Sequence, residues 1–246
     1  MEKRSLYTIW ENTPIAQDVF RLRLAGDGGW VQRPGQFVNI ALSGKYLRRP
    51  ISVCDWEQDG LTLIYKVVGS GTAQMASMRP GQTLDLLTGL GNGFDTAPAR
   101  GQRILLAGGG VGVPPRYGLA RTLRGQGESV QCVLGFRSAC DVFYRREFEA
   151  LGCGVFVTTD DGSCGEHGFV TDVMKKLDYD YYFACGPQPM LKAVHGAGGR
   201  GQLSFEERMG CGFGACMGCS CQTLTGSKRI CVDGPVLLSE EVRFDG

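Results

Sequence analysis

The 246-residue chain carries 26 basic and 25 acidic side chains, a formal net charge of +1. A charge this close to neutral gives no electrostatic basis for binding nucleic acid or an anionic membrane. Hydrophobic residues make up 43% of the chain, which argues against disorder. The sequence begins without an apolar core of signal-peptide length, and it contains no apolar window of about 18 residues. Neither export nor a membrane span is predicted, and we expect a cytoplasmic protein.

The contents of glycine and cysteine are both unusual. The 38 glycines follow no collagen period, so we expect them in turns and in loops that cradle ligands. Of the 11 cysteines, five fall between Cys211 and Cys231. In a reducing compartment such a cluster indicates metal binding or redox chemistry rather than disulfides. The remaining six are expected to be small buried side chains: Cys54, Cys132, Cys140, Cys153, Cys164 and Cys185.

Residues 1–98 predict a small antiparallel β-barrel. Short runs with alternating or β-branched character are separated by turn signals rich in glycine and proline. The six expected strands cover residues 6–10, 19–24, 37–42, 51–55, 61–67 and 83–87.

Residues 99–198 change to alternating strands and helices. Buried-looking strands that alternate with helices indicate a parallel sheet with helices on both faces. Ligands of such sheets bind beyond the carboxyl ends of the strands. The expected strands cover residues 103–107, 130–136, 155–159 and 181–185, and the expected helices 115–124, 142–151, 170–177 and 189–195.

Residues 199–246 are expected to form a third, small unit. The glycine-rich stretch 196–201 predicts a flexible link, and the segment after it has little apolar mass. A unit this small needs a staple or a metal in order to fold.

The cysteines of this unit follow a C-x4-C-x2-C-x11-C pattern: Cys211, Cys216, Cys219 and Cys231. The first three spacings match the plant-type 2Fe–2S pattern, in which the fourth cysteine comes from further along the chain. Small intervening residues would let backbone N–H groups point at the sulfurs. A structural zinc site, which also uses four thiolates, is the alternative. Cys221 lies in the same loop, and spacing does not exclude it as a substitute ligand.

A glycine-rich run, Gly108 to Pro115, directly follows a buried strand and opens a helix. Glycines let phosphate oxygens approach the backbone, and a helix N-terminus favours anions. Because Val113 occupies the sixth position, the run departs from the G-x-G-x-x-G fingerprint, and a merely tight turn is the alternative. Two more loops, 159–162 and 185–190, follow strands of the same sheet, so the three loops together describe a dinucleotide site.

The last candidate binding motif lies in the barrel, in residues 47–52 and 64–72. The fork of donors on Arg49 suits a diphosphate, and Gly69, Gly71 and Thr72 suit a close approach of phosphate. A basic turn followed by a hairpin explains the same residues without a ligand. No hydrolytic constellation is present: the chain has two histidines and no G-x-S-x-G motif.

The order of these motifs resembles the ferredoxin–NADP reductase superfamily and, more narrowly, the family of electron-transfer subunits of class 1B dihydroorotate dehydrogenases. The resemblance covers nearly the whole chain. It implies an FAD-binding barrel (1–98), an NAD-binding α/β domain (99–198) and a 2Fe–2S region (199–246). The implied FAD residues are Arg49, Pro50, Ile51, Ser52, Ile64, Tyr65, Lys66, Gly71 and Thr72. The implied NAD residues are Gly108, Gly109, Gly110, Gly112, Pro114, Asp160, Cys185, Gly186, Pro187 and Met190. The implied cluster ligands are Cys211, Cys216, Cys219 and Cys231.

Two positions qualify this resemblance. The superfamily has a tyrosine where this chain has Ile51, which removes an aromatic ring from the flavin face. Arg137 follows the second strand of the nucleotide domain, where it could accept the 2′-phosphate of NADP. The family nevertheless implies NAD.

The family also implies a function. Electrons from the FMN of a dihydroorotate dehydrogenase catalytic subunit would pass through the 2Fe–2S cluster and FAD to NAD+, in pyrimidine biosynthesis. Flavin belongs between the cluster and NAD+, because it can exchange single electrons with the first and an electron pair with the second. A two-plus-two heterotetramer with that partner is implied. The rivals are an NAD(P)H–ferredoxin oxidoreductase or a hydrogenase-type diaphorase subunit, and more remotely a metal-stapled sensor or binding module.

Overall fold

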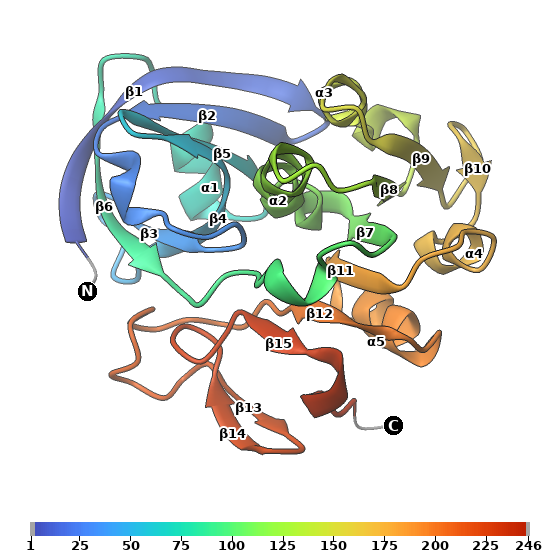
Figure 1. Ribbon diagram of the computed structural model, residues 1–246. Helices are drawn as coiled ribbons and strands as arrows, with labels where there is room; N and C mark the ends of the chain where they lie inside the picture. Colours follow the sequence, from blue (N-terminus) through green and yellow to red (C-terminus); the bar gives the residue numbers. More distant parts are fainter. Residues whose placement is uncertain (1–2, 245–246) are drawn as a thin grey trace.

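The computed structural model describes residues 3–244 and contains the three expected regions. A closed barrel and a seven-stranded sheet stand side by side, and the C-terminal cysteine region lies beneath both (Figure 1). Within the described residues no helix is both long and apolar enough to cross a membrane.

The barrel is antiparallel throughout, and its strand order is β1-β2-β5-β4-β3-β6. Alternate side chains point inward, as the regular burial pattern of β6 shows. One short helix, α1 (Ser70–Ala76), contributes Met75 to the barrel core. The prediction of six strands is confirmed, with these bounds: β1 Lys3–Ala16, β2 Val19–Ala25, β3 Phe37–Ala41, β4 Arg49–Glu57, β5 Gly60–Lys66 and β6 Thr83–Leu90.

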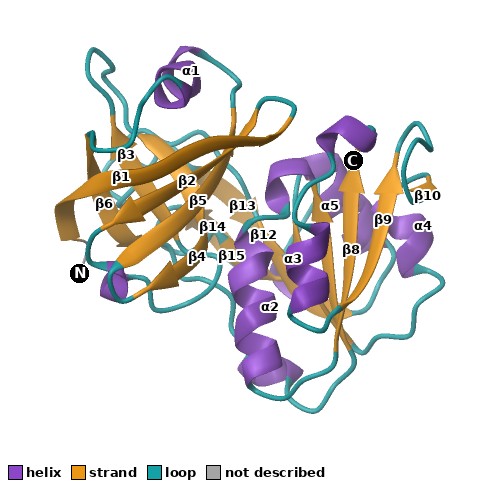
Figure 2. Ribbon diagram, turned by 90° about the horizontal axis from the view of Figure 1, so that it is seen from above, coloured by secondary structure: helices purple, strands orange, loops and turns teal. Residues whose placement is uncertain are grey.

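The seven-stranded sheet has the order β10-β9-β8-β7-β11-β12-β15, and only β15 runs antiparallel to its neighbour. Two separate apolar cores lie on its two faces, one beneath α2 and α3 and the other beneath α4 and α5. The expected arrangement of helices on both faces is confirmed (Figure 2). The strands are β7 Ile104–Gly109, β8 Val130–Phe136, β9 Gly154–Thr159, β10 Glu166–His167, β11 Tyr181–Cys185, β12 Arg200–Ser204 and β15 Val236–Leu238. The helices are α2 Pro115–Gly125, α3 Arg145–Ala150, α4 Val170–Met174 and α5 Gln188–Gly196.

Two helices are shorter than expected. The helix predicted from residue 142 begins only at Arg145, because Tyr144 adopts a left-handed backbone with a φ of 64° that no α-helix continues through. The helix predicted over 170–177 ends at Met174, and a turn follows it.

The expectation of a flexible link at 196–201 is wrong. β12 begins at Arg200 and pairs along its whole length with β11, so the sheet continues past residue 198. The strand has little apolar character, which hid it in the sequence. Polar contacts hold it instead: the Gln202 amide donates to the carbonyl oxygen of Asp95 (2.7 Å) and to the hydroxyl of Tyr181 (3.1 Å).

The cysteine region adds one hairpin, β13 (Ser220–Thr223) with β14 (Gly226–Arg229). Its apolar residues Cys219, Ile230 and Cys231 belong to the same core as Leu105 of β7 and Phe37 of β3. A segment with so little apolar mass of its own is therefore stabilised by sharing the core of its neighbours.

Candidate functional site

A cavity of about 730 Å³ lies between the barrel and the carboxyl ends of β7, β8 and β9. This edge of a parallel sheet is where ligands bind in α/β folds. The cavity brings together most of the predicted dinucleotide residues with one predicted flavin residue, Lys66. Those lining it are Gly109, Gly110, Gly112, Asp160, Gly186, Pro187 and Met190; the predicted residues Gly108, Pro114 and Cys185 lie behind this surface.

The glycine-rich loop packs so closely against the β11–α5 loop that a side chain at Gly112 or Gly186 would clash with the opposite loop. A Cβ on Gly112 would lie 2.3 Å from the carbonyl oxygen of Cys185, and one on Gly186 would lie 3.1 Å from the nitrogen of Gly109. Gly110 adopts a φ of 52°, which glycine tolerates best. The loops thus present bare backbone to the cavity, as close approach of a phosphate requires.

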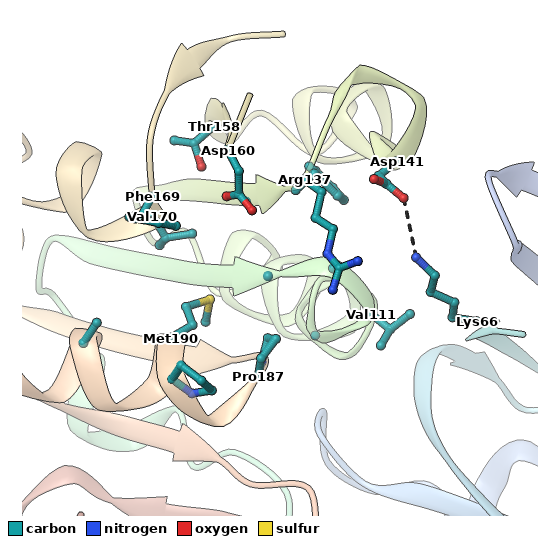
Figure 3. Close-up of a pocket in the computed structure, with 18 of the residues that line it drawn as sticks. Lys66, Val111, Arg137, Asp141, Thr158, Asp160, Phe169, Val170, Pro187 and Met190 are labelled. Carbon is teal, nitrogen blue, oxygen red and sulfur yellow. Dashed lines mark ion pairs between the residues drawn. The ribbon is translucent and has the colours of Figure 1, made fainter. Parts of the chain in front are cut away.

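Charged side chains enter the cavity from both sides (Figure 3). Lys66 of the barrel forms an ion pair with Asp141 of the nucleotide domain at 3.5 Å, so this contact joins the two bodies. Arg137 extends into the space between that pair and Asp160. Sequence reasoning missed Asp141, because its partner lies far away in the sequence.

Arg116 is the most unusual residue of this region. It is fully buried, and its Nη1 donates to the carbonyl oxygen of Cys185 at 3.3 Å. Among residues 3–244 its Nε and Nη2 have no hydrogen-bond partner. Burial lowers the pKa of the guanidinium from 12.5 to about 10. The group fits only because Gly108 has no side chain, since a Cβ there would lie 0.9 Å from Nη2. Its spacing of three and seven residues from Leu119 and Leu123 could have placed it on the buried helix face.

In the barrel, the predicted flavin residues Arg49 and Gly71 lie against each other, and Thr72 follows Gly71 in α1. A Cβ on Gly71 would lie 2.2 Å from Nε of Arg49, so the bare glycine makes room for the guanidinium. The Thr72 hydroxyl accepts the N–H groups of Val68 (2.9 Å) and Gly69 (3.2 Å) and so fixes the loop before α1. Arg49 forms no ion pair with any described carboxylate; its Nη1 donates to the carbonyl oxygen of Leu47. This available charge fits a diphosphate.

The residues of β5 point alternately to different places. Ile64 packs into the core shared with the nucleotide domain, and Lys66 reaches the cavity. Tyr65 instead faces the barrel interior, where its hydroxyl donates to Asn12 at 3.0 Å. Burial raises the pKa of Tyr65 to about 12. The ring of this predicted flavin residue is therefore directed away from the cavity. Pro50, Ile51 and Ser52 lie on β4, directly opposite β3.

The four predicted cluster ligands lie as two pairs. Cys211 accepts the N–H of Ala215 at 3.2 Å, and Cys216 accepts those of Cys211 (3.4 Å) and Gly218 (3.5 Å). Cys219, which is buried, accepts the N–H of Cys231 at 3.4 Å. Backbone N–H groups aimed at sulfur are the arrangement that stabilises thiolates in iron–sulfur loops. Across residues 3–244 no three His, Cys, Asp or Glu side chains are grouped closely enough to hold one metal ion, so the fit rests on the donor set and its N–H contacts.

Cys221 lies on β13 opposite Lys228 and packs against the shared apolar core. Burial raises the pKa of its thiol. Cys219 and Cys231 belong to the same core, and burial raises the pKa of Cys231 to about 12. Burial therefore does not separate Cys221 from the predicted ligands, and its exclusion from the ligand set stays a prediction from the spacing.

The cysteine region is attached to the rest of the chain by two asparagines that sequence reasoning missed. Asn39 of β3 donates to the carbonyl oxygen of Cys211 at 3.1 Å. Asn92 donates to the carbonyl oxygen of Val236 at 2.7 Å and accepts the N–H of the same residue at 3.1 Å. Both contacts span more than a hundred residues of sequence, so no local pattern could have revealed them.

Comparison with known proteins places both predicted modules. Residues 106–196 match the oxidoreductase NAD-binding domain, and residues 206–243 match the iron–sulfur cluster binding domain of dihydroorotate dehydrogenase B. The chain is 44% identical to the dihydroorotate dehydrogenase B (NAD(+)) electron transfer subunit of Geobacillus sp. (strain WCH70), over 98% of this chain and 99% of that protein. It is 45% identical to the corresponding subunit of Bacillus caldolyticus, with coverage of 97% and 98%.

Solved structures agree. A chain of an NADH-dependent reduced ferredoxin–NADP oxidoreductase superimposes with a TM-score of 0.87 at 33% identity, covering 98% of this chain and 91% of that one. A ferredoxin NADP+ reductase from Neisseria gonorrhoeae with bound FAD and NADP superimposes with a TM-score of 0.68 at 17% identity, which shows the fold alone.

Proposed function

The chain belongs to the family of electron-transfer subunits of dihydroorotate dehydrogenase B, and we propose that it carries electrons from the FMN of a catalytic partner subunit to NAD+. FAD and a 2Fe–2S cluster are its resident cofactors, and NAD is its nucleotide. The proposal rests on three features that one chain combines. These are the nucleotide cavity, Arg49 with its charge available for a diphosphate, and the cysteine loop (residues 211–219), which is attached to the barrel through Asn39. In this role the chain supports the oxidation of dihydroorotate to orotate in pyrimidine biosynthesis.

The flavin supplies the exchange between single electrons and the electron pair of a hydride. The protein's own residues bind and orient. Arg49 would hold the FAD diphosphate beside Gly71, with Pro50, Ile51, Ser52 and Lys66 along the rest of the flavin. The bare loops 109–112 and 186–190 would admit the nicotinamide dinucleotide, and Cys211, Cys216, Cys219 and Cys231 would hold the cluster.

The ion pair between Lys66 and Asp141 has a positioning role in this scheme. It joins the barrel to the nucleotide domain at the rim of the cavity. Because hydride transfer requires the two reacting rings at close range, a contact that fixes the two bodies relative to each other assists it.

The partner would dock over the cysteine loop. Phe213 (43% exposed) and Met217 (57%) belong to this loop, Val232 (41%) follows Cys231, and the loop residue Cys216 is exposed. Apolar side chains beside an exposed thiol suit a protein partner that exchanges electrons there. We propose a two-plus-two heterotetramer with the FMN-containing catalytic subunit. None of the 11 cysteines forms a disulfide among the described residues, and we propose a cytoplasmic location.

A second candidate is a subunit of an NADH-dependent ferredoxin–NADP oxidoreductase. The structural similarity at 33% identity favours it, and it would retain all three cofactor sites. The higher identity of 44% over nearly the full length of the dehydrogenase subunit supports the first proposal.

The decisive experiment purifies the chain anaerobically, with and without the co-expressed FMN-containing dehydrogenase subunit. The chain alone should contain FAD, iron and sulfide, and should reduce dyes with NADH. It should not oxidise dihydroorotate, because abstraction of a substrate proton normally needs a positioned base, and none is assigned in this chain. Addition of the partner should create dihydroorotate-dependent reduction of NAD+. Dihydroorotate turnover by the chain alone would overturn the proposal, and association with a ferredoxin instead would favour the second candidate.

The flavin assignment has its own test. Arg49→Ala should weaken FAD retention by about 10- to 150-fold, since a charge-assisted phosphate contact contributes roughly 1.5–3 kcal/mol. Arg48→Ala is the matched control, because Nη2 of Arg48 already forms an ion pair with Oδ1 of Asp85 at 2.9 Å. Equal flavin content in the two variants would move the diphosphate site elsewhere.

A further inference from the structure

Strand β3 separates the predicted flavin segment from the cysteine loop. On one side it pairs with β4, where Asn39 lies opposite Pro50 and Phe37 lies opposite Ser52. Its alternate residues Val38 and Ile40 fill the barrel core. Phe37 points the other way and packs into the core that contains Cys219 and Cys231. One strand thus contacts both regions that the proposed function assigns to redox groups.

Asn39 makes the direct polar contact across this boundary. Its side chain is 1% exposed, and its Nδ2 donates to the carbonyl oxygen of Cys211 at 3.1 Å. The next residue of the loop is shaped around this amide: a Cβ on Gly212 would lie 2.3 Å from Nδ2, and Gly212 has a φ of 80°.

The asparagine is itself held in place. Arg48 donates from Nη1 to the backbone carbonyl oxygens of Asn39 (3.2 Å) and Asp85 (3.1 Å), and its Nη2 pairs with the Asp85 carboxylate at 2.9 Å. Oδ1 of Asn39 is buried and has no hydrogen-bond partner among the described residues. A buried amide with an unsatisfied oxygen destabilises the fold, so this position is not explained by stability alone.

We propose that Asn39 is a positioning residue for electron transfer, which ties the backbone of Cys211 to the strand beside the flavin segment and so fixes the separation of the two redox groups. The inference rests on the proposed function, because it takes Cys211 as a cluster ligand and β4 as a flavin segment. Two single electrons cross this boundary for each hydride that NAD+ accepts. Since the rate of electron tunnelling falls steeply with distance, a small shift of the loop would slow the transfer.

The test uses the purified holoprotein under anaerobic conditions, with NADH as the reductant. Asn39→Leu removes the amide donor and keeps the number and branching of the side-chain heavy atoms, and Gly212→Ala disturbs the same contact from the loop side. Stopped-flow absorbance separates the bleaching of the flavin from the slower bleaching of the cluster. Iron and sulfide content and the electron paramagnetic resonance spectrum of the reduced cluster provide readouts besides activity.

Asn92→Leu is the matched control. Asn92 attaches the same region through Val236 of β15 and through the carbonyl oxygen of Asp233 (3.2 Å), so its loss loosens the attachment without removing a contact to Cys211. In Asn39→Leu and Gly212→Ala we expect reduction of the cluster to slow by about 10- to 100-fold, the usual effect of removing a group behind a metal ligand. The resonance spectrum should change as well, while NADH–dye reduction through the flavin stays normal. Asn39→Gln, which keeps a donor, should recover part of the rate.

Loss of iron from Asn39→Leu but not from Asn92→Leu would also support the role, because the loop would then need its anchor to hold the cluster. Native transfer and a native spectrum in Asn39→Leu, or equal effects of the Asn39 and Asn92 variants, would overturn it. Failure of NADH to reduce any cluster in the unmodified protein would instead refute the proposed function.

Discussion

Cys185 and Cys211 are two thiols whose surroundings give them opposite properties. Cys185 ends β11 inside the nucleotide domain, where only 2% of its surface is exposed, and burial raises its pKa to about 12. Cys211 is half-buried on the cysteine loop. Burial opposes its ionisation too, but hydrogen bonds from the backbone N–H groups of Phe213, Cys216 and Ala215 and from the Cys216 thiol outweigh it and lower the pKa to about 6.

For these two thiols, burial and hydrogen bonds to sulfur, rather than neighbouring charges, set the direction of the pKa shift. The nearest cation of Cys185 is Arg116, and even this buried charge does not compensate for the loss of water. The cysteine loop reaches the opposite result with uncharged N–H groups. Its small residues, such as Gly214 and Ala215, allow the chain to turn tightly enough to aim them.

The largest expected effect is on the iron content, when one thiol is removed from the cysteine loop and one from the end of β11. Cys216→Ala should eliminate the cluster and stop electron transfer from the partner, while NADH–dye reduction partly survives because that path avoids the cluster. Cys185→Ala should retain full iron and sulfide. Iron analysis checks both, and Cys221→Ala is the control that should also keep its iron. Stoichiometric zinc in place of iron in the unmodified protein would contradict this prediction.

The next largest expected effect is a difference in alkylation between Cys185 and an exposed cysteine. The pKa of Cys185 is raised from 9.0 to about 12, so at pH 8 its thiolate fraction should be about a thousandfold below that of an ordinary thiol. Iodoacetamide should therefore leave Cys185 unmodified at pH 8, and labelling should increase as the pH approaches the raised pKa. Mass spectrometry of peptides quantifies this, with the exposed Cys140 as the internal reference. Comparable labelling of Cys185 and Cys140 at pH 8 would be inconsistent with the buried environment.

A third change tests how closely the interior beside Cys185 is packed. Gly108→Ala would place a Cβ 0.9 Å from Nη2 of Arg116, and we expect it to lower the free energy of unfolding by about 3 kcal/mol. Gly125→Ala, with nothing within 4 Å, is the matched control and should be neutral or slightly stabilising. Chemical denaturation measures both. If adding Arg116→Ala to Gly108→Ala recovers none of the loss, the clash with Arg116 is not its cause.

The smallest expected effect concerns the buried cation itself. Its pKa falls from 12.5 to about 10, which corresponds to an unfavourable free energy of about 3 kcal/mol for the charged form at neutral pH. Arg116→Met removes that penalty and loses one hydrogen bond of about 1 kcal/mol. The net result should be a gain of about 2 kcal/mol in stability. Because the unfolded arginine keeps its proton up to 12.5 and the folded one only to about 10, the gain should shrink as pH rises through that range. A destabilised Arg116→Met protein at pH 7 would contradict the prediction that the buried charge lowers the stability.

The sequence by itself determined the parts of this protein that depend on neighbours in the chain. Apolar runs such as residues 103–107 predicted the parallel strands, and turn residues marked the barrel. The cysteine spacing predicted a cluster-binding segment because all four proposed ligands lie within 21 residues, from Cys211 to Cys231. Local spacing constrains backbone shape, so patterns of period two, period 3.6 and ligand spacing are readable without a fold.

Only the tertiary structure decided how these parts meet. The strand at Arg200–Ser204 has too little apolar character to be recognised, and it forms because β11 and β15 satisfy its backbone on both sides. Tyr65 faces the barrel interior because its side of β5 is packed in the barrel core. The Arg116 guanidinium is buried because its face of α2 packs against the sheet. Asn39 reaches Cys211 across 172 residues of sequence. Contacts of that range depend on the arrangement of whole domains, because the interaction energy is realised only after distant strands have closed on each other.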